Sequence, residues 1–394
     1  MAEPVGYLQL FALGLSMQLT EMPKQVQLYN MRSPQQPLSN ILIAGGGSGG
    51  HVAPAIAAAE AIVEQGASVL LAHSTRKVDF EIMRESPFES LSISASPLSL
   101  KPIGFIRFCI NFFNASKKIQ SLIKQRDITC VLATGGFVSA PALHAARKLG
   151  CKTVLLNLDN PPGKANKLAV RWADTVLSTV LCSLDDAIII SPPLRQSVIA
   201  SDDAQTCKNR LGLDPNRLTL LVTGASQGAT TINQLIPTLA KNNPALFHGW
   251  EVLHIAGDAN TVEVKQLWED CCVPNKVLGF THSMADAWGA ADLAITRGGA
   301  NTIAEIAINC VPSIILPYPY HKDDHQRTNA EPLEKLGGVV IAKDHKELTL
   351  NIQDIGPEIV ELMAHHQTRF AMRQAMLNAP AVNDAISIAN ACLR

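Results

Sequence analysis

The chain has 394 residues, of which 47% are hydrophobic and 17% charged, and its formal net charge is -1. This composition is typical of a folded, rather apolar globular protein and excludes an intrinsically disordered one. The chain is too long for one ordinary hydrophobic core, so we expect two domains. Its nearly neutral net charge excludes an electrostatic attraction of the whole chain to nucleic acid. The nine cysteines form no C-x-x-C pair, which favours reduced thiols in a cytoplasmic protein over a zinc or redox site.

Residues 1–39 precede the first predicted strand. The apolar run from Tyr7 to Leu19 resembles the hydrophobic part of a signal peptide, but Glu3 stands where positive charges belong and no convincing cleavage pattern follows. We expect a loose N-terminal extension, or a later start of the protein at Met22 or Met31. No transmembrane helix is expected in the chain.

The first domain opens with a strand, a glycine-rich turn and a helix. Ile41 to Ala44 are apolar and predict a buried strand, and five of the six residues from Gly45 to Gly50 are glycine, which lets the backbone approach a ligand closely. Helix formers follow from Val52 to Glu64. Backbone amides at such a turn and at a helix N-terminus favour an anion or a polar ligand. We therefore predict a ligand site here, with His51 beside it.

Two alternatives compete for this turn. The stretch GGGSGG also fits the G-x-G-x-x-G spacing of an NAD(P)-binding fold, which requires an acidic residue at the end of the second strand. That strand, Ser68 to Ala72, is followed by no acid, although Arg76 could accept a 2′-phosphate. A turn that serves only packing is the second alternative, and the density of glycine argues against it.

Pro97 to Arg126 combines isoleucine and phenylalanine side chains with several lysines and arginines. This pattern is typical of a helix that enters the headgroup layer of an anionic membrane. A helix that packs its apolar face on the domain's own core is the alternative. We expect Phe108, Phe112 and Phe113 to contribute to the membrane contact.

Further units of strand, turn and helix follow. Cys130 to Ala146 contains a strand, the Gly135-Gly136 turn and a helix, and Thr153 to Leu156 is the next strand. This alternation predicts an α/β fold with doubly wound parallel sheets, whose ligands lie beyond the carboxyl ends of the strands. The polar segment from Ser191 to Asp214 predicts a linker between two domains.

The second domain repeats the opening pattern. Leu218 to Thr223 predicts a strand, and Gly224 to Gly228 forms a second polar loop. Farther on, a helix predicted from Asn301 to Asn309 would offer Thr302 and free amides to phosphate oxygens, and Glu305 to vicinal hydroxyls such as those of a ribose. A role for Glu305 only in helix capping is the alternative. One ligand loop in each of two facing domains indicates group transfer between two substrates.

Five stretches resemble one family of enzymes. Ser48 to Pro54 (SGGHVAP), Thr134 to Pro141 (TGGFVSAP), Gly224 to Ala229 (GASQGA), Arg297 to Ala307 (RGGANTIAEIA) and Asp323 to Lys335 (DDHQRTNAEPLEK) occur in collinear order. Together they are similar to the MurG-type UDP-N-acetylglucosamine:N-acetylmuramyl-(pentapeptide) pyrophosphoryl-undecaprenol N-acetylglucosamine transferases. The similarity covers both domains, and several motifs in the right order are more specific than any single one.

The resemblance implies a GT-B fold, in which two Rossmann-like domains face one another across a cleft. Residues 40–194 would then bind the acceptor and the membrane, residues 195–367 would bind UDP-GlcNAc, and residues 368–394 would form a C-terminal helix that crosses back to the N-terminal domain. The implied reaction inverts the anomeric carbon. It moves N-acetylglucosamine from UDP-GlcNAc to the MurNAc C4 hydroxyl of lipid I, an undecaprenyl-diphosphate-linked acceptor, and gives lipid II for peptidoglycan synthesis.

The resemblance also implies partners and a location. The enzyme would lie peripherally on the cytoplasmic face of the bacterial inner membrane, without a nucleic-acid partner and without a cofactor. No metal is expected in the transfer step, and the chain contains no Asp-x-Asp.

Site residues carry over from the family motifs. His51 is the candidate general base, because histidine accepts protons near neutral pH; a role in capping or in orienting the acceptor is the alternative. Glu305 would hold the ribose, Thr281 would lie near the uracil, and His325 with Gln326 would hold the N-acetylglucosamine. The acceptor side would comprise Ser48, Gly49, Gly50, Gly135, Gly136 and Asn160. The donor side would comprise Arg195, Ser226, Gln227, Thr281, Ala300, Asn301, Thr302, Glu305, His325 and Gln326.

One segment departs from the family. Asn157-Leu158-Asp159-Asn160 stands where the family usually carries His-Glu-Gln-Asn, so a histidine and a carboxylate are missing. Asp159 could supply the carboxylate from the next position, although side chains alternate along an extended segment and would point it elsewhere. Two alternatives therefore stay open: a GT-B transferase with a different lipid or sugar acceptor, and a non-catalytic sugar-nucleotide-binding relative. A UDP-N-acetylglucosamine epimerase is a weaker alternative, because it explains neither SGGHVAP nor the basic aromatic segment.

Overall fold

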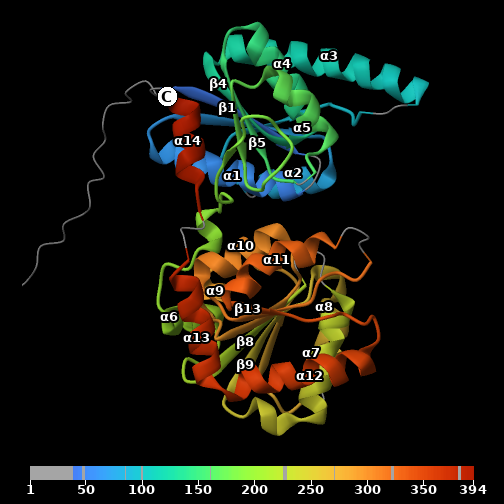
Figure 1. The fold of residues 1–394 in the computed structure, drawn as a ribbon, viewed down its shortest axis with the longest axis vertical. Coiled ribbons are helices and arrows are strands. Elements are labelled where there is room, and N and C mark those ends of the chain that lie inside the picture. Colours follow the sequence, from blue (N-terminus) through green and yellow to red (C-terminus); the bar gives the residue numbers. More distant parts are fainter. Residues whose placement is uncertain are drawn as a thin grey trace, which may run out of the picture. The chain divides into compact units, whose positions relative to one another are not determined.

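A computed structural model describes residues 39–46, 49–84, 86–98, 101–159, 161–224, 229–269, 271–320, 324–379 and 383–394. Residues 1–38 lie outside the described residues, so only Ser39 of the expected N-terminal extension is described. The described residues fold around two parallel β-sheets, each flanked by helices (Figure 1). We call each sheet with its helices a lobe.

The sheet of the first lobe has seven strands in the order β3-β2-β1-β4-β5-β6-β7. Its strands are β1 (Asn40–Gly46), β2 (Ser68–Ser74), β3 (Ser90–Ile93), β4 (Ile128–Gly136), β5 (Lys152–Asn157), β6 (Thr175–Ser178) and β7 (Ile188–Ile189). Its helices are α1 (Gly49–Glu64), α2 (Lys77–Arg84), α3 (Pro102–Gln125), α4 (Ser139–Lys148), α5 (Lys164–Ala169) and α14 (Ala385–Leu393), with a 3-10 turn at Val170–Trp172. Every strand pair is parallel, which confirms the predicted doubly wound architecture.

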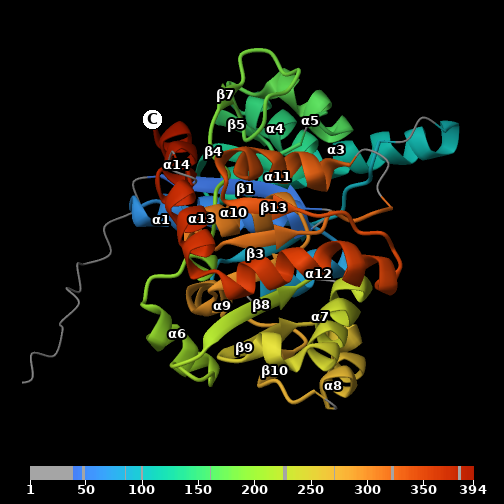
Figure 2. The ribbon, with the colours of Figure 1, turned by 60° about the horizontal axis from the view of Figure 1, so that its bottom comes forward.

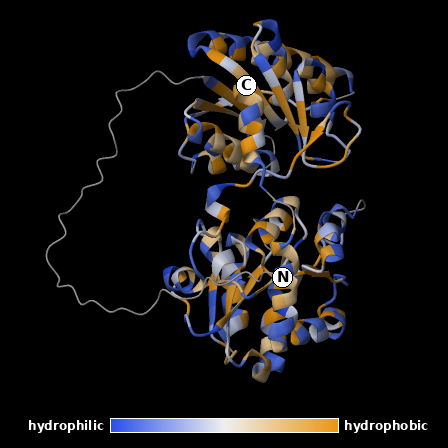
Figure 3. Ribbon diagram, turned by 60° about the vertical axis from the view of Figure 1, so that its left-hand side comes forward, coloured by the Kyte–Doolittle hydropathy of each residue, from blue (hydrophilic) through white to orange (hydrophobic). Residues whose placement is uncertain are grey.

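Helices cover both faces of this sheet, which is why its central strands are apolar throughout. Ile41 and Ile43 of β1 point into a cluster with α1 and α14, while Leu42 and Ala44 point into a cluster with α3 and α4. Parallel strands that are buried on both faces read as continuous apolar runs rather than as alternating ones. The hydropathy colouring shows the strands in the interior of each lobe as mostly hydrophobic (Figure 3).

The sheet of the second lobe has six strands in the order β10-β9-β8-β11-β12-β13. Figure 2 labels β8, β9, β10 and β13 of this sheet. Its strands are β8 (Leu218–Thr223), β9 (Trp250–Ile255), β10 (Asn275–Leu278), β11 (Leu293–Thr296), β12 (Ser313–Ile315) and β13 (Val339–Ile341). Its helices are α6 (Ala204–Leu211), α7 (Thr230–Asn242), α8 (Thr261–Glu269), α9 (Met284–Ala290), α10 (Ala300–Asn309), α11 (His325–Leu336), α12 (Leu348–Ala364) and α13 (His366–Leu377), with 3-10 turns at Gln196–Val198, Pro244–Phe247 and Asp258–Asn260.

Some elements differ from the sequence-based expectation. Helix α1 begins at Gly49, so His51 lies in the first helical turn instead of the preceding loop, and Pro54 lies inside the helix, past its first turn. Ser191 to Asp214, which the sequence predicts to be a linker, contains helix α6. Asp203 caps that helix by accepting a hydrogen bond from the Thr206 amide at 2.9 Å, a sequence signal for a helix start.

The last helix, α14, packs on the first lobe although it follows α13 of the second lobe in sequence (Figures 1 and 2). It contacts α1, β4 and β5. Its buried side chains Ala385, Ile388, Ala389 and Cys392 belong to the same apolar cluster as Ile41 and Ile43. The C-terminus therefore completes one face of the first lobe's core.

Candidate active site

A pocket of about 870 Å³ lies where strands of both sheets reach their carboxyl ends. From the first lobe it is lined by Gly50 and His51 of α1 and by Thr179 after β6. From the second lobe it is lined by Thr223 at the end of β8 and by the first turn of α10. Ligands of doubly wound sheets bind beyond these strand ends, so this pocket is the candidate active site.

His51 is held in one tautomer by the neighbouring strand. Its Nδ1 atom lies 3.1 Å from the Thr134 carbonyl oxygen, and the Thr134 hydroxyl donates to the His51 carbonyl oxygen at 3.1 Å. A carbonyl oxygen only accepts, so Nδ1 carries the proton in this hydrogen bond. The neutral ring then keeps a lone pair on Nε2, which is the atom that can accept a proton from a ligand.

Glycines at the ends of β1 and β4 make room for this arrangement. A Cβ atom on Gly135, whose φ is +111°, would lie 2.5 Å from His51 Nδ1. A Cβ atom on Gly136 would lie 1.6 Å from the carbonyl oxygen of Gly46. Both distances are far below a van der Waals contact, so the two turns can interlock only as glycine. Gly135 thus makes room for the histidine and Gly136 for the end of β1, and Gly136 also lines a second, smaller pocket.

The second lobe presents the N-terminus of α10 to the pocket. Gly299 caps this helix in an extended conformation, and Ala300, Asn301 and Thr302 in the first turn line the pocket. The first turn contains no acidic residue. Free amides and the positive end of the helix dipole make this turn suitable for the phosphate groups of a ligand.

Glu305 lies one turn farther along α10 and also lines the pocket. The indole Nε1 of Trp288, itself 1% exposed, donates to Glu305 Oε2 at 2.9 Å. Burial raises the pKa of Glu305, while the Trp288 hydrogen bond and the charge of Arg195 act in the opposite direction. Because the indole occupies Oε2, Oε1 keeps its capacity to accept from a ligand hydroxyl.

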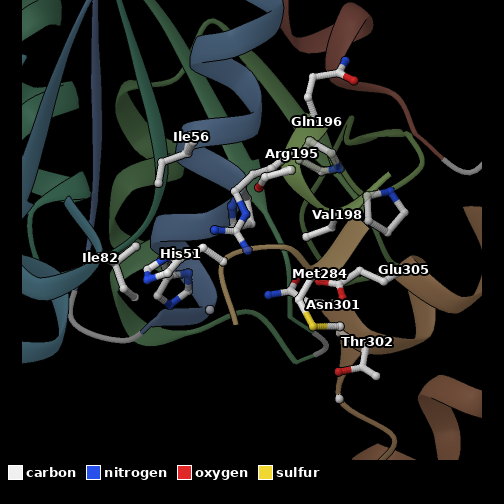
Figure 4. Close-up of a pocket in the computed structure, with 18 of the residues that line it drawn as sticks. His51, Ile56, Ile82, Arg195, Gln196, Val198, Met284, Asn301, Thr302 and Glu305 are labelled. Atoms are coloured by element: carbon white, nitrogen blue, oxygen red, sulfur yellow. The ribbon is translucent and has the colours of Figure 1, made fainter. Parts of the chain in front are cut away.

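Arg195 stands between the two halves of the site. In the close-up its side chain lies between His51 on one side and Asn301 and Glu305 on the other (Figure 4). Next to it, the Gln196 amide donates to Glu60 Oε2 of α1 at 2.8 Å. Burial raises the pKa of Glu60, and both this hydrogen bond and the charge of Arg195 oppose that shift. The positive charge of Arg195 therefore acts on the carboxylates of Glu60 and Glu305, one from each lobe.

A buried ion pair joins the loops after β11 and β13. The Arg297 guanidinium donates through Nη1 to Asp344 Oδ2 at 2.8 Å and to the Leu316 carbonyl oxygen at 2.9 Å. Burial alone would raise the pKa of Asp344, but the Lys346 amide and Arg297 hold it below its ordinary value. Arg297 directly precedes the Gly298-Gly299 turn, so this pair fixes the start of α10.

Gln326 supports the same turn. Its Oε1 atom accepts from the Gly298 amide at 3.3 Å and from the Tyr318 amide at 2.9 Å. Among the described residues that line the large pocket, neither His325 nor Gln326 is included, whereas Thr281 is. Thr281 Oγ1 accepts from the Ser283 amide at 3.0 Å, which orders the loop before α9.

The segment Asn157-Leu158-Asp159-Asn160, which departs from the family motif, begins in the protein interior and continues to the large pocket. Asn157 is fully buried, and its Nδ2 donates to the Asp159 carbonyl oxygen at 2.9 Å and to Ser178 Oγ at 3.1 Å. Asp159, in contrast, is exposed and lines the large pocket. The expectation that alternation would turn Asp159 away from the site is therefore wrong, because strand β5 ends at Asn157 and the alternation ends with it.

Several expected site residues lie outside the described residues, namely Ser48, Asn160, Ser226 and Gln227. Gly49 is the first residue of α1. Within the part of the chain that is described, no group of three or more His, Cys, Asp or Glu side chains is arranged to hold a metal ion.

Glu60 and Trp288 are site residues that the sequence motifs do not reveal. Glu60 is one of many residues on a helix of ordinary composition, and Trp288 reaches Glu305 only because α9 packs against α10. The one available signal is that Trp288 is among only four tryptophans in the chain.

Comparison with known proteins places this site in a family. Residues 41–178 match the glycosyltransferase family 28 N-terminal domain, and residues 219–387 match the C-terminal domain of that family. The UDP-N-acetylglucosamine--N-acetylmuramyl-(pentapeptide) pyrophosphoryl-undecaprenol N-acetylglucosamine transferase of Streptomyces coelicolor is 34% identical over 79% of this chain and 86% of its own. The enzyme of the same name from Clavibacter michiganensis is 33% identical over 77% and 83%.

A solved structure has the same fold. Acinetobacter baumannii MurG superimposes with a TM-score of 0.66 at 22% identity, covering 90% of this chain and 99% of that one. The fold and the matched domains define a family 28 glycosyltransferase, and the predicted GT-B fold is confirmed. More specifically, the chain belongs to the family of UDP-N-acetylglucosamine--N-acetylmuramyl-(pentapeptide) pyrophosphoryl-undecaprenol N-acetylglucosamine transferases.

Proposed function

We propose that this chain transfers N-acetylglucosamine from UDP-GlcNAc to the C4 hydroxyl of the N-acetylmuramyl sugar of a pyrophosphoryl-undecaprenol-linked acceptor. The observation that carries the proposal is the large pocket, in which a histidine with an available Nε2 faces the N-terminus of α10 and Glu305. A proton acceptor on one side and an anion-binding helix start on the other are what group transfer from a nucleoside diphosphate requires.

The second lobe would hold the donor. The first turn of α10 would bind the diphosphate, and Glu305, oriented by Trp288, would accept hydrogen bonds from the ribose hydroxyls. Thr281 also lines the pocket, and the uracil would bind beside it. Gln326 would act indirectly, because its side-chain oxygen is engaged by the Gly298 and Tyr318 amides.

The transfer is a direct displacement. The acceptor hydroxyl oxygen forms the new bond to C1 of N-acetylglucosamine while His51 Nε2 takes its proton, and the bond from C1 to the diphosphate oxygen breaks. UDP leaves with the bonding electrons, so the anomeric configuration inverts. Negative charge grows on the diphosphate in the transition state, and the α10 dipole and Arg195 stabilise it there.

Transfer assays with the purified protein, UDP-GlcNAc and a lipid-linked muramyl acceptor test this proposal. We expect a disaccharide product, and we expect His51→Ala to lower kcat by roughly 10²-fold or more, as loss of a general base does. His248→Ala is the matched control, because His248 is exposed and does not line the pocket. Donor binding without any product, or an unchanged rate in His51→Ala, would contradict the mechanism.

The first lobe would contact the membrane through α3. One face of this helix exposes Ile103, Ile106, Ile110 and Phe113 by 80%, 59%, 56% and 57% of their surfaces. These positions recur at helical spacing, and exposed Arg107 stands beside them. An apolar face next to a cation suits the interface of an anionic membrane. None of the helices in the described part of the chain has the length and apolarity to span a bilayer.

The structure corrects the choice of residues for testing this contact. Phe112 is only 9% exposed and stacks against His144 and Trp172 in the core, so it does not belong to the exposed face. Changing Ile103, Ile106 and Ile110 together to serine should reduce sedimentation with anionic liposomes. Val262→Ser is the control, because Val262 lies on the second lobe and is 71% exposed. Equal sedimentation of all variants would refute the membrane contact.

A further inference from the structure

A second pocket, of about 240 Å³, adjoins the candidate active site. His51 and Asp159 line both pockets, so the two cavities meet at the candidate base. The walls of the second pocket are mainly apolar, and they are formed by Leu98, Phe108, Phe137, Ala140 and Leu168. Nothing in the donor chemistry described above uses this cavity.

The pocket leads from the catalytic side toward the exposed face of α3. Phe108 lines the pocket, and its ring lies 6.4 Å from that of Phe105, which is 48% exposed on the same helix. Ser96 also lines the pocket, and Asn111 Nδ2 of α3 donates a hydrogen bond to Ser96 Oγ at 2.6 Å. An apolar path thus connects the catalytic histidine with the surface that would meet the membrane.

The polar groups of this pocket are few. Lys164 is an exposed cation at its edge, and Asn166, 2% exposed, lies in its wall. Asn166 Nδ2 donates to Asn157 Oδ1 at 3.0 Å, while Asn166 Oδ1 has no hydrogen-bond partner among the described residues. A bound peptide would need many partners for its backbone amides, and the pocket offers few. A hydrocarbon chain that follows an anionic group fits the apolar wall and the single lysine better.

We propose that this pocket binds the beginning of the acceptor's polyprenyl chain, next to its diphosphate, and guides the chain from the active site to α3. The inference rests on the proposed function for the nature of the acceptor. It assigns Phe108, Leu168 and Gly163 to recognition of the lipid rather than of the sugar. Gly163 lines the pocket, and a Cβ atom added there would meet no atom within 4 Å.

Two acceptors separate lipid recognition from sugar recognition. Both carry the same muramyl diphosphate, one with a farnesyl tail and one with a methyl group, and both are assayed in detergent-free solution without membranes. The variants are Phe108→Ala, which removes part of the wall, and Gly163→Leu, which adds a bulky side chain to the lining without a clash at Cβ. Val262→Ala is the control, because Val262 is exposed on the second lobe and lines neither pocket.

Both pocket variants should raise KM for the farnesyl acceptor by about tenfold, since a buried apolar side chain contributes at least that factor. They should leave KM for the methyl acceptor and for UDP-GlcNAc unchanged, and the control should behave as the wild type. An equal rise in KM for both acceptors, or no rise for either, would overturn the proposal. Thermal melting of each variant shows whether the fold is kept, and Gly163→Leu decides the matter if Phe108→Ala unfolds.

Direct binding distinguishes failure of this inference from failure of the proposed function. Farnesyl diphosphate is titrated against the wild type and Gly163→Leu by calorimetry. If the wild type transfers sugar to neither acceptor, the proposed function fails. Even then, farnesyl diphosphate binding that is about tenfold weaker in Gly163→Leu than in the wild type supports a lipid-binding role of this pocket. Equal binding of farnesyl diphosphate by both proteins refutes the lipid subsite.

Discussion

Replacing Gly135 by alanine tests how closely the glycine turn positions His51. The added Cβ atom would lie 2.5 Å from His51 Nδ1 and 2.6 Å from Cε1. The ring cannot turn away freely, because Nδ1 is hydrogen-bonded to the Thr134 carbonyl oxygen at 3.1 Å. The imidazole must therefore move by about 1 Å to restore a normal contact, and a misplacement of that size can reduce catalysis by roughly 10²-fold.

The expected result is a fall of about 10²-fold in kcat with little change in KM for UDP-GlcNAc, measured by initial rates. Gly150→Ala is the control, because Gly150 also has a positive φ, +72°, while nothing lies within 4 Å of an added Cβ atom. Each substitution strains the backbone by roughly 1–2 kcal/mol, so urea denaturation should show both variants destabilised. If Gly135→Ala keeps the kcat of Gly150→Ala, the reasoning about His51 is wrong.

Three further predictions concern the second lobe. Trp288→Phe removes the donor to Glu305 and should raise KM for UDP-GlcNAc about tenfold with kcat kept; an unchanged KM would contradict the role of the indole. Burial raises the pKa of Glu305 in the folded protein above its ordinary value. The protonated group therefore stabilises the fold below the ordinary pKa, and this contribution is lost as pH rises through the raised pKa. Glu305→Gln should therefore gain stability relative to the wild type as pH rises, which urea denaturation at several pH values checks; a constant difference would refute it. Arg297→Ala leaves Asp344 buried without its cation and should cost about 3–5 kcal/mol in the free energy of unfolding, whereas a cost near zero would refute the importance of the pair.

Much of the fold can be predicted from local patterns. Apolar runs that end in glycine mark strands and turns, because a strand buried on both faces needs a continuous apolar run and a tight turn needs freedom in φ. Gly135 and Gly136 illustrate this well, since both adopt positive φ angles next to His51. The family motifs add the pocket residues Thr302 and Glu305, which lie together at the start of α10.

The rest depends on packing that local patterns do not contain. Whether Phe112 or Phe113 faces the core is decided by the rotation of α3 against α4, and the sequence contains both side by side. The contact between Trp288 and Glu305 requires two helices to meet at one register. Gln326 looks like a ligand residue within its motif, and only the position of Tyr318 shows that its oxygen accepts from the backbone.

The position of α14 has a consequence for how the chain is made. The first lobe's strands leave the ribosome before the second lobe, but Ala385, Ile388 and Cys392 of the same apolar cluster are synthesised only after the second lobe. At typical synthesis rates the unfinished lobe would wait on the order of 10–40 s for its final helix. During that time one face of β4 and α1 stays uncovered, so we expect the nascent first lobe to expose this apolar surface until α14 has been synthesised.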